Sequence, residues 1–299
     1  MSRKQKQRNS GPGGHSGPPP TIDRVIARAL EGGARPEPAR PQELARMAQV
    51  APMPAELTAL YTARFDLAVG PVELLEPPVF EDVNGGRAAF GELADMTYFA
   101  TDRAEGVFFL DMFDRLGLGP GFVFWVERGL MAADEVVPCG ETLAAFLAAV
   151  QDGHHPWHAP TLGERALERF RAAAANPPPG VDLRPGIAPV AFVQARRAGG
   201  LVVSFALGEI LKVTDGVYFA ASRREIVPFN QMRAVAGGGV VIVGHDPELG
   251  TLGVTQGDWQ DLPADRLLAC SDPEHPETGR LLGRFADVLT FWIEEARRA

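Results

Sequence analysis

Residues 98–110 read YFATDRAEGVFFL, and they carry the pattern on which our prediction of the fold depends most. A hydrophobic run ends at Asp102, Gly106 follows four residues later, and a second hydrophobic run begins directly after it. Aromatic and β-branched runs separated by turn-forming residues are typical of two antiparallel strands joined by a hairpin. We therefore expect a β-hairpin at this point of the chain.

The segments on either side extend the pattern. Residues 54–65 place apolar side chains at helical spacing, and a short apolar run at 72–75 follows them. Beyond the hairpin, a strand-like run covers residues 121–126, and a helix with one apolar face is expected over residues 142–150. The order of helix, strands and helix predicts the α+β class, with a mainly antiparallel sheet flanked by helices.

The same pattern returns in the second part of the chain. Residues 242–246 (IVGHD) are followed by Gly250 and by residues 251–254 (TLGV), so the interval from Asp to Gly is again four. A strand-like run at 266–271 and a closing apolar helix at 285–293 then follow in the same order. Shared order and spacing favour an internal duplication. We expect Phe146 and Phe285 to hold equivalent core positions on the two closing helices.

Composition suggests where the boundaries fall. Residues 1–20 are basic and rich in Gly and Pro, so they are expected to form a disordered tail. A first domain is expected over residues 21–153, and a second, more divergent one over residues 183–299. Residues 154–182 are expected to be a linker that contains a helix. The second domain is expected to open with strand-like runs at 190–194 and 201–205.

This ordered set of features resembles the SUKH superfamily. Its members begin with a helix such as residues 54–65 (PAELTALYTARF) and continue through a segment such as residues 70–75 (GPVELL). They then form a hairpin that contains Asp and Gly, and they end with a helix such as residues 143–147 (LAAFL). The second copy matches over residues 207–295, with DGVYF at 215–219 after its first helix. The resemblance implies two tandem SUKH-like domains.

The resemblance also implies a function. The family consists mostly of immunity proteins for bacterial polymorphic toxins, often nucleases or deaminases, and it includes fungal cell-wall-synthesis regulators. We expect a non-catalytic protein that neutralises a cognate toxin by direct binding and needs no cofactor. The formal net charge of −9 favours a basic protein partner rather than nucleic acid. A housekeeping regulatory scaffold without a toxin partner is an open alternative.

Acidic residues around the first hairpin are the candidate partner-binding residues. Four of them fall within thirteen residues, namely Asp102, Glu105, Asp111 and Asp114. Carboxylates in turns are usually solvated, so we interpret them as an acidic rim that faces the partner rather than as a catalytic acid/base pair. Charges on the rim of an interface act mainly on the association rate.

A histidine cluster supports a different hypothesis. His154, His155 and His158 lie in the sequence GHHPWH, and neighbouring imidazoles suit zinc or copper. Pro156 keeps them from sharing one face of a helix, and no fourth ligand is evident. A metal-dependent hydrolase that uses this loop is therefore the alternative function, whereas our main interpretation has no metal site and no catalytic residue.

The remaining features favour a cytoplasmic protein. The sequence has no run of about 18 apolar residues, as a membrane span needs, and its N-terminus lacks the apolar core of a signal peptide. Cys139 and Cys270 have no CxxC pairing and are expected to be buried hydrophobic residues. Trp125 and Trp259 are candidates either for core packing or for partner anchors.

Overall fold

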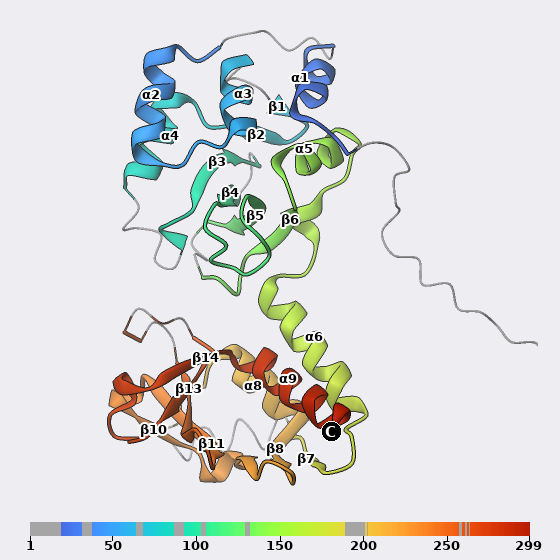
Figure 1. Ribbon diagram of the computed structural model, residues 1–299, viewed down its shortest axis with the longest axis vertical. Coiled ribbons are helices and arrows are strands. Elements are labelled where there is room, and N and C mark those ends of the chain that lie inside the picture. Colours follow the sequence, from blue (N-terminus) through green and yellow to red (C-terminus); the bar gives the residue numbers. More distant parts are fainter. Residues whose placement is uncertain are drawn as a thin grey trace, which may run out of the picture.

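The computed structural model belongs to the α+β class and contains two antiparallel sheets (Figure 1). The sheets lie at opposite ends of the long axis, and helix α6 (Leu162–Ala175) runs between them. We call the elements up to η2 (Pro156–His158) the N-terminal half and those from α6 onward the C-terminal half. The structure describes residues 19–31, 38–63, 68–86, 93–102, 106–128, 132–188, 201, 203–256, 259–260, 262 and 264–299.

The sheet of the N-terminal half is an antiparallel meander in the order β1-β2-β3-β4-β5-β6. Phe99 and Phe108 face a core shared with helices α3 and α5, whereas Tyr98 and Phe109 face a smaller core on the opposite side. Successive residues of a strand point to opposite faces, which explains this division. The elements are α1 (Ile22–Glu31), α2 (Pro41–Val50), α3 (Ala55–Ala63), β1 (Ala68–Val69), β2 (Val72–Leu74), α4 (Pro77–Gly85), β3 (Thr97–Thr101), β4 (Gly106–Asp111), β5 (Phe122–Glu127), β6 (Val137–Gly140) and α5 (Leu143–Gln151).

The sheet of the C-terminal half has the order β14-β13-β12-β11-β9-β8-β7, and β10 pairs with β11 beside this path. Helices α6, α8 and α9 bury their apolar side chains together against this sheet in one core. The elements are β7 (Val181–Pro185), α8 (Phe205–Val213), β8 (Thr214–Phe219), β9 (Arg224–Ile226), η3 (Phe229–Gln231), β10 (Arg233–Val235), η4 (Ala236–Gly238), β11 (Val240–Asp246), β12 (Gly250–Thr255), β13 (Arg266–Cys270), η5 (Pro276–Thr278), β14 (Arg280–Arg284) and α9 (Phe285–Arg298).

The two predicted hairpins have the same register. Tyr98 pairs with Phe109 and Ala100 with Phe108, so that Phe99 forms a bulge. At positions 144 residues further along, Ile242 pairs with Gly253, Gly244 pairs with Leu252, and the bulge recurs at Val243. The next ladders also correspond, because β5–β6 and β13–β14 both shift register after the second residue of β5 and of β13, at 123/124 and 267/268. The predicted correspondence of these strands is confirmed.

The closing helices differ in detail. Phe146 and Phe285 are both fully buried, as expected of core residues. Phe285 is, however, the first residue of α9, whereas Phe146 is the fourth residue of α5. The two positions are therefore one helical turn apart, and the expectation that they are equivalent is wrong. The Thr142 hydroxyl accepts a hydrogen bond from the Ala145 N–H at 3.1 Å and caps α5, whereas no side chain caps α9.

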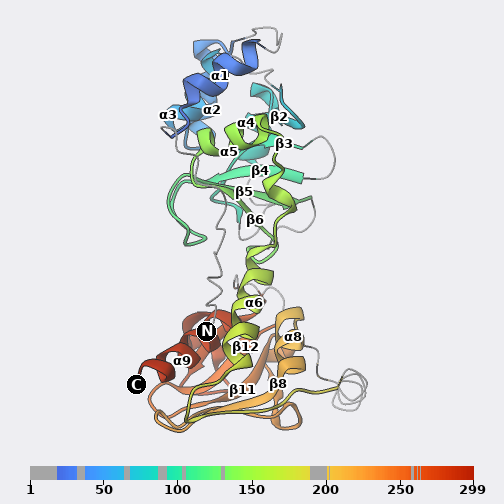
Figure 2. The same cartoon turned by 90° about the vertical axis from the view of Figure 1, so that its right-hand side faces the viewer.

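Helix α6 belongs to the packing of both halves. Leu162 packs in the smaller core of the N-terminal half, whereas Leu167 and Phe170 are buried in the core of the C-terminal half. Figure 2 shows the helix leaving the N-terminal half and lying along the C-terminal one. The segment expected to be a linker, residues 154–182, thus contributes side chains to both cores. Its final residues begin β7, which pairs with β8.

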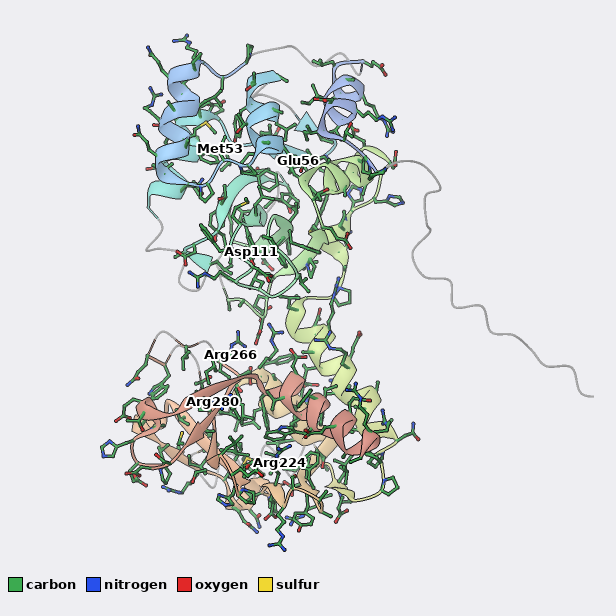
Figure 3. All side chains as sticks on the ribbon, in the orientation of Figure 1. Met53, Glu56, Asp111, Arg224, Arg266 and Arg280 are labelled. Carbon is green, nitrogen blue, oxygen red and sulfur yellow. The ribbon has the colours of Figure 1, made fainter. Side chains whose placement is uncertain are left out.

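One carboxylate joins the two halves. Asp134, in the loop before β6, lies 2.5 Å from Nε of Arg284 and 3.3 Å from Nη1 of Arg266 (Figure 3 labels Arg266). Its backbone carbonyl also accepts the N–H of Gly163 at 2.9 Å, close to the start of α6. These contacts connect the N-terminal half to β13 and β14 of the C-terminal half.

Several expectations for the second part of the chain need revision or lie outside the described residues. Residues 215–219 lie within strand β8, which follows α8 directly. Leu201 and Val203 are not in a strand, and α8 begins at Phe205. The run at 190–194, Glu105 and residues 1–18 of the expected tail lie outside the described residues. Within the described ranges, no helix has the length and apolar composition to cross a membrane.

Candidate functional site

Asp111 does not lie on an exposed rim, contrary to our expectation. Its side chain is 1% exposed, and its carboxylate accepts the backbone N–H groups of Phe113, Arg115 and Leu116 at 3.2, 2.9 and 2.7 Å. A buried carboxylate needs such donors to offset its lost hydration. Asp111 therefore organises the turn after β4 (Figure 3).

Asp114 is exposed and lies in the same turn. It has a φ of 55°, and its carboxylate accepts the N–H of Gly119 at 2.7 Å. Asp and Asn are among the few residues other than Gly that adopt this left-handed conformation readily. Asp114 therefore has a local structural role, although its exposure leaves it available to a partner.

Asp102 connects the first hairpin to a tryptophan. Its Oδ1 accepts the N–H of Gly106 at 2.9 Å, and its Oδ2 accepts the indole Nε1–H of Trp125 at 3.0 Å. A Cβ atom on Gly106 would lie 1.8 Å from the indole nitrogen, so the Trp125 ring lies directly across this glycine. The close approach explains why Gly is needed at position 106, and the hydrogen bond fixes the ring beside the carboxylate.

This arrangement forms one side of a pocket of about 390 Å³, which we call the acidic aromatic pocket. Its walls come from the β1–β2 turn, the first hairpin, β5 and the histidine loop. Several of its residues, such as Glu127 and His158, are exposed, so the pocket opens to solvent. The lining residues are Pro71, Asp102, Trp125, Glu127, His155, Trp157 and His158.

Trp157 forms the inner wall of the pocket. It is 7% exposed, and its ring packs edge to face against Phe108 at a centroid distance of 5.2 Å. The ring of His155 packs edge to face with that of Trp157, and their centroids lie 5.0 Å apart. The β-sheet core therefore holds Trp157 in place, and Trp157 in turn orients the histidine loop.

The pocket favours a positively charged group. Asp102 and Glu127 supply two carboxylates, and Trp125 and Trp157 supply two indole surfaces. Indole faces attract cations, and carboxylates form strong hydrogen bonds with cationic N–H donors. The volume lies in the range of sites that take a small ligand or a protruding side chain.

The metal hypothesis has little geometric support in the described part of the chain. His155 and His158 lie side by side, with ring centroids 5.6 Å apart, and both line the pocket. Among the described residues, however, no three His, Cys, Asp or Glu side chains are grouped so that they could hold a metal ion. His154 is exposed and does not line the pocket.

The C-terminal half has an ion cluster at the corresponding corner of its sheet. Asp246 occupies the position of Asp102, since Asp102 follows the pair Thr101–Val107 and Asp246 follows the corresponding pair His245–Thr251. Arg224 lies on β9, which corresponds to β2, and its Nε donates to Asp246 at 2.6 Å. Its Nη1 donates to Glu295 at 2.8 Å, and its guanidinium carbon lies 5.1 Å from the Trp292 ring (Figure 3 labels Arg224).

The environment of Asp246 favours its charged form. Burial alone would raise the pKa of this carboxyl, which is 1% exposed. The N–H groups of Glu248 and Leu249 and the guanidinium of Arg224 outweigh burial and hold its pKa below the usual range. Asp246 is therefore ionised at neutral pH and forms an ion pair with Arg224.

Sequence reasoning identified parts of the pocket but not the whole. Asp102, Trp125 and two of the histidines were singled out for separate reasons, and the fold brings them together. Trp157, Glu127 and Pro71 were missed as site residues. The sequence GHHPWH contains Trp157 between the histidines, which was a usable signal, because aromatic residues are enriched at binding sites.

We assign structural roles to Trp259, to the two cysteines and to the three glycines at 237–239. Trp259 lies across Gly239, where an added Cβ would meet the ring at 2.1 Å. Gly237 and Gly238 both have positive φ in the turn before β11. Both cysteines are buried, and burial raises the pKa of the Cys139 thiol.

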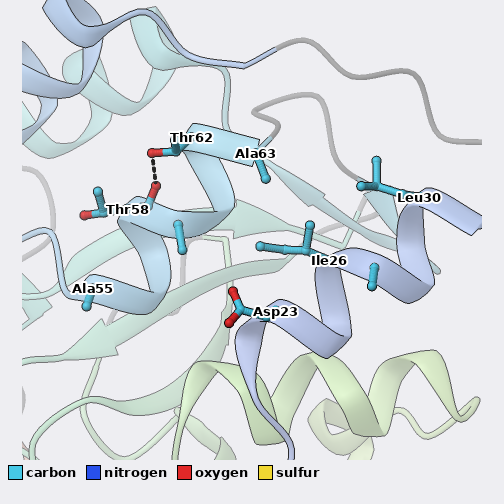
Figure 4. A pocket seen from close by; sticks show the side chains of 9 residues that line it. Asp23, Ile26, Leu30, Ala55, Thr58, Thr62 and Ala63 are labelled. Carbon is cyan, nitrogen blue, oxygen red and sulfur yellow. Dashed lines mark hydrogen bonds between the residues drawn. The ribbon is translucent and has the colours of Figure 1, made fainter.

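A second hollow lies between α1 and α3 (Figure 4). It has a volume of about 650 Å³ and is lined mainly by small or apolar side chains, with Asp23 as its charged group. The Thr62 hydroxyl donates to the carbonyl of Thr58 at 2.7 Å within α3 itself. This hollow thus offers few polar groups that could orient a ligand. We therefore consider the acidic aromatic pocket the better candidate site.

Comparisons with protein-family models, with curated proteins and with solved structures found no match.

Proposed function

We propose that this chain is a non-catalytic binding protein whose acidic aromatic pocket takes a positively charged group of a basic protein partner. The resemblance to SUKH immunity proteins suggests that the partner is a bacterial toxin, neutralised by direct binding in the cytoplasm. The single observation that supports the proposal most strongly is the pocket itself, where two indoles and two carboxylates meet at a surface open to solvent.

The energetics of interfaces agree with this proposal. Binding energy concentrates in a few anchors, and tryptophan is enriched among them. Trp125 is held by Asp102 and Trp157 by Phe108, so neither ring has to be ordered when the partner binds. Preorganised side chains reduce the entropic cost of association. The net charge of −9 would add long-range attraction to a basic partner.

The test is direct binding to the proteins encoded by the neighbouring reading frames. We expect one basic protein among them to bind the intact chain, and co-expression to restore growth to cells that produce it. The variant Glu127→Gln should weaken this binding and reduce its salt dependence, because it removes a pocket charge from an exposed side chain. If no protein encoded beside this chain binds it, the proposal of an immunity function is wrong.

A further inference from the structure

The proposed function leaves the chemistry of the bound group open, and the C-terminal half indicates what it is. The guanidinium of Arg224 donates hydrogen bonds to the carboxylates of Asp246 and Glu295 and lies over the ring of Trp292, all within the C-terminal half. Resting on the proposed function, we propose that the acidic aromatic pocket binds the guanidinium group of an arginine side chain on the partner protein. The pocket would thus bind a guanidinium that belongs to another protein, whereas the C-terminal half supplies a guanidinium from its own strand β9.

The positions of the groups support this inference. Thr101 pairs with Val107, and 144 residues later His245 pairs with Thr251, so the two aspartates that follow occupy the same place. Glu73 pairs with Thr101 just as Glu225 pairs with His245. By this register Arg224 corresponds to Val72, the neighbour of Pro71 in the pocket wall. The internal guanidinium and the pocket therefore lie at the same corner of their sheets.

The remaining groups are similar but come from different elements. Trp292 lies on α9, whereas Trp157 lies on η2, which follows the shorter helix α5. The second carboxylate is Glu295 of α9 in one half and Glu127 of β5 in the other. Both sites thus combine an aspartate at the hairpin, a glutamate and a tryptophan.

Geometry favours arginine over lysine. In the C-terminal half, Nε and Nη1 of one guanidinium reach two different carboxylates while its plane lies over an indole. A planar fork with several fixed donors can do this, whereas a lysine ammonium is a compact point charge with a stronger hydration shell. Asp102 accepts the N–H groups of Gly106 and Trp125, and these contacts hold its negative charge at the wall of the pocket.

The experiment titrates the intact chain with three capped glycine peptides that differ only in a central arginine, lysine or citrulline. Citrulline keeps the shape of arginine without its charge. The chain has four tryptophans, Trp125, Trp157, Trp259 and Trp292, so their indole N–H signals in a nitrogen-15 spectrum report on both sites. We expect the arginine peptide to shift the signals of Trp125 and Trp157 saturably and to leave those of Trp259 and Trp292 unchanged.

The variants make the assignment specific. Glu127→Gln should weaken arginine-peptide binding by about fivefold or more, as expected for losing one charge-assisted contact. Glu31→Gln is the matched control, because it makes the same change at an exposed glutamate of α1 that does not line the pocket, and it should leave the affinity unchanged. Since Asp102→Asn could disturb the hairpin, it serves only as a second variant whose fold is checked in the same spectrum.

Each outcome decides the inference. Selective binding of the arginine peptide, weakened by Glu127→Gln only, supports it. Equal binding of the lysine or citrulline peptide, shifts away from Trp125 and Trp157, or equal weakening by Glu31→Gln would overturn it. If the peptides fail but the partner protein still depends on Glu127, the proposed function stands and the guanidinium inference falls. If the arginine peptide binds but no protein partner does, the inference stands and the immunity function falls.

Discussion

The two halves place an aspartate at the same corner of a similar sheet but use it differently. In the C-terminal half, Asp246 is buried and forms an ion pair with Arg224 of the same half. In the N-terminal half, Asp102 is partly exposed and borders an open pocket with two tryptophans. One strand framework can thus support either an internal ion cluster or an open pocket, depending on which side chains the adjoining elements supply.

The largest expected effect tests whether both cores stabilise their halves equally. Phe146→Ala and Phe285→Ala should each lower the free energy of unfolding by about 3 to 5 kcal/mol, because both rings are fully buried. Denaturant unfolding monitored by circular dichroism measures both. A change below about 1 kcal/mol for either variant would show that this half can repack around the loss, contrary to the comparison.

The next prediction concerns the aspartates themselves. Asp246→Asn should destabilise the protein by about 2 kcal/mol, because it leaves the partly buried guanidinium of Arg224 with a weaker partner. Asp102→Asn should cost less, about 1 kcal/mol, since its carboxylate is more exposed. Chemical unfolding of the two variants side by side provides the measurement. Equal losses would mean that the two corners are energetically alike.

The pH dependence of the Asp246 effect has a defined sign. The pKa of Asp246 is lowered in the folded protein, so its contribution to stability is complete above the unfolded value of about 3.9. It is lost as the pH falls through the folded pKa. The difference in unfolding free energy between the unaltered protein and Asp246→Asn should therefore be larger at about pH 7 than at about pH 3. A difference that grows in acid would contradict this assignment.

Gly106 and Gly250, which occupy corresponding positions in the two hairpins, should respond differently to substitution by alanine. Gly250 has a φ of 95°, and an added Cβ would lie 2.6 Å from the carbonyl oxygen of Cys270, so Gly250→Ala should cost about 1 to 3 kcal/mol of stability. Gly106→Ala meets the Trp125 ring instead, and it should chiefly displace the indole and weaken ligand binding at the pocket. Thermal unfolding and the Trp125 indole signal distinguish these outcomes. An unmoved Trp125 signal in Gly106→Ala would count against the described ring position.

The smallest expected effect is that of Asp114→Asn. Asn adopts the left-handed conformation of this residue about as well as Asp, and its side chain can still accept the N–H of Gly119. The free energy of unfolding should change by less than about 0.5 kcal/mol. A much larger loss would show that the charge of Asp114 supports the turn.

The fold was predictable where local patterns were strong. The hairpins at Asp102 and Asp246, with an apolar helix after each, follow from alternating apolar runs and turn residues. The packing of α6 on α9 was not predictable, because its amphipathic pattern does not reveal which core it covers. The burial of Asp111 was also missed, since a carboxylate that receives three backbone N–H groups has the same sequence context as a solvated turn residue.

The site was only partly predictable for a related reason. Trp125, Asp102 and the histidine loop are separated by more than twenty residues each, and only the sheet register brings them together. The correspondence in position between the Arg224 ion cluster and the pocket depends on which strands pair and where they bulge. Neither property can be deduced from composition or spacing alone.

Helix α6 has a consequence for how the molecule unfolds. Its first residue, Leu162, is anchored in one half, whereas Phe170 is anchored in the other. A helix is a cooperative structure, in which loss of one turn weakens its neighbours. Melting of either core therefore removes part of the support of the other, so a single cooperative transition in calorimetry is expected rather than two independent ones.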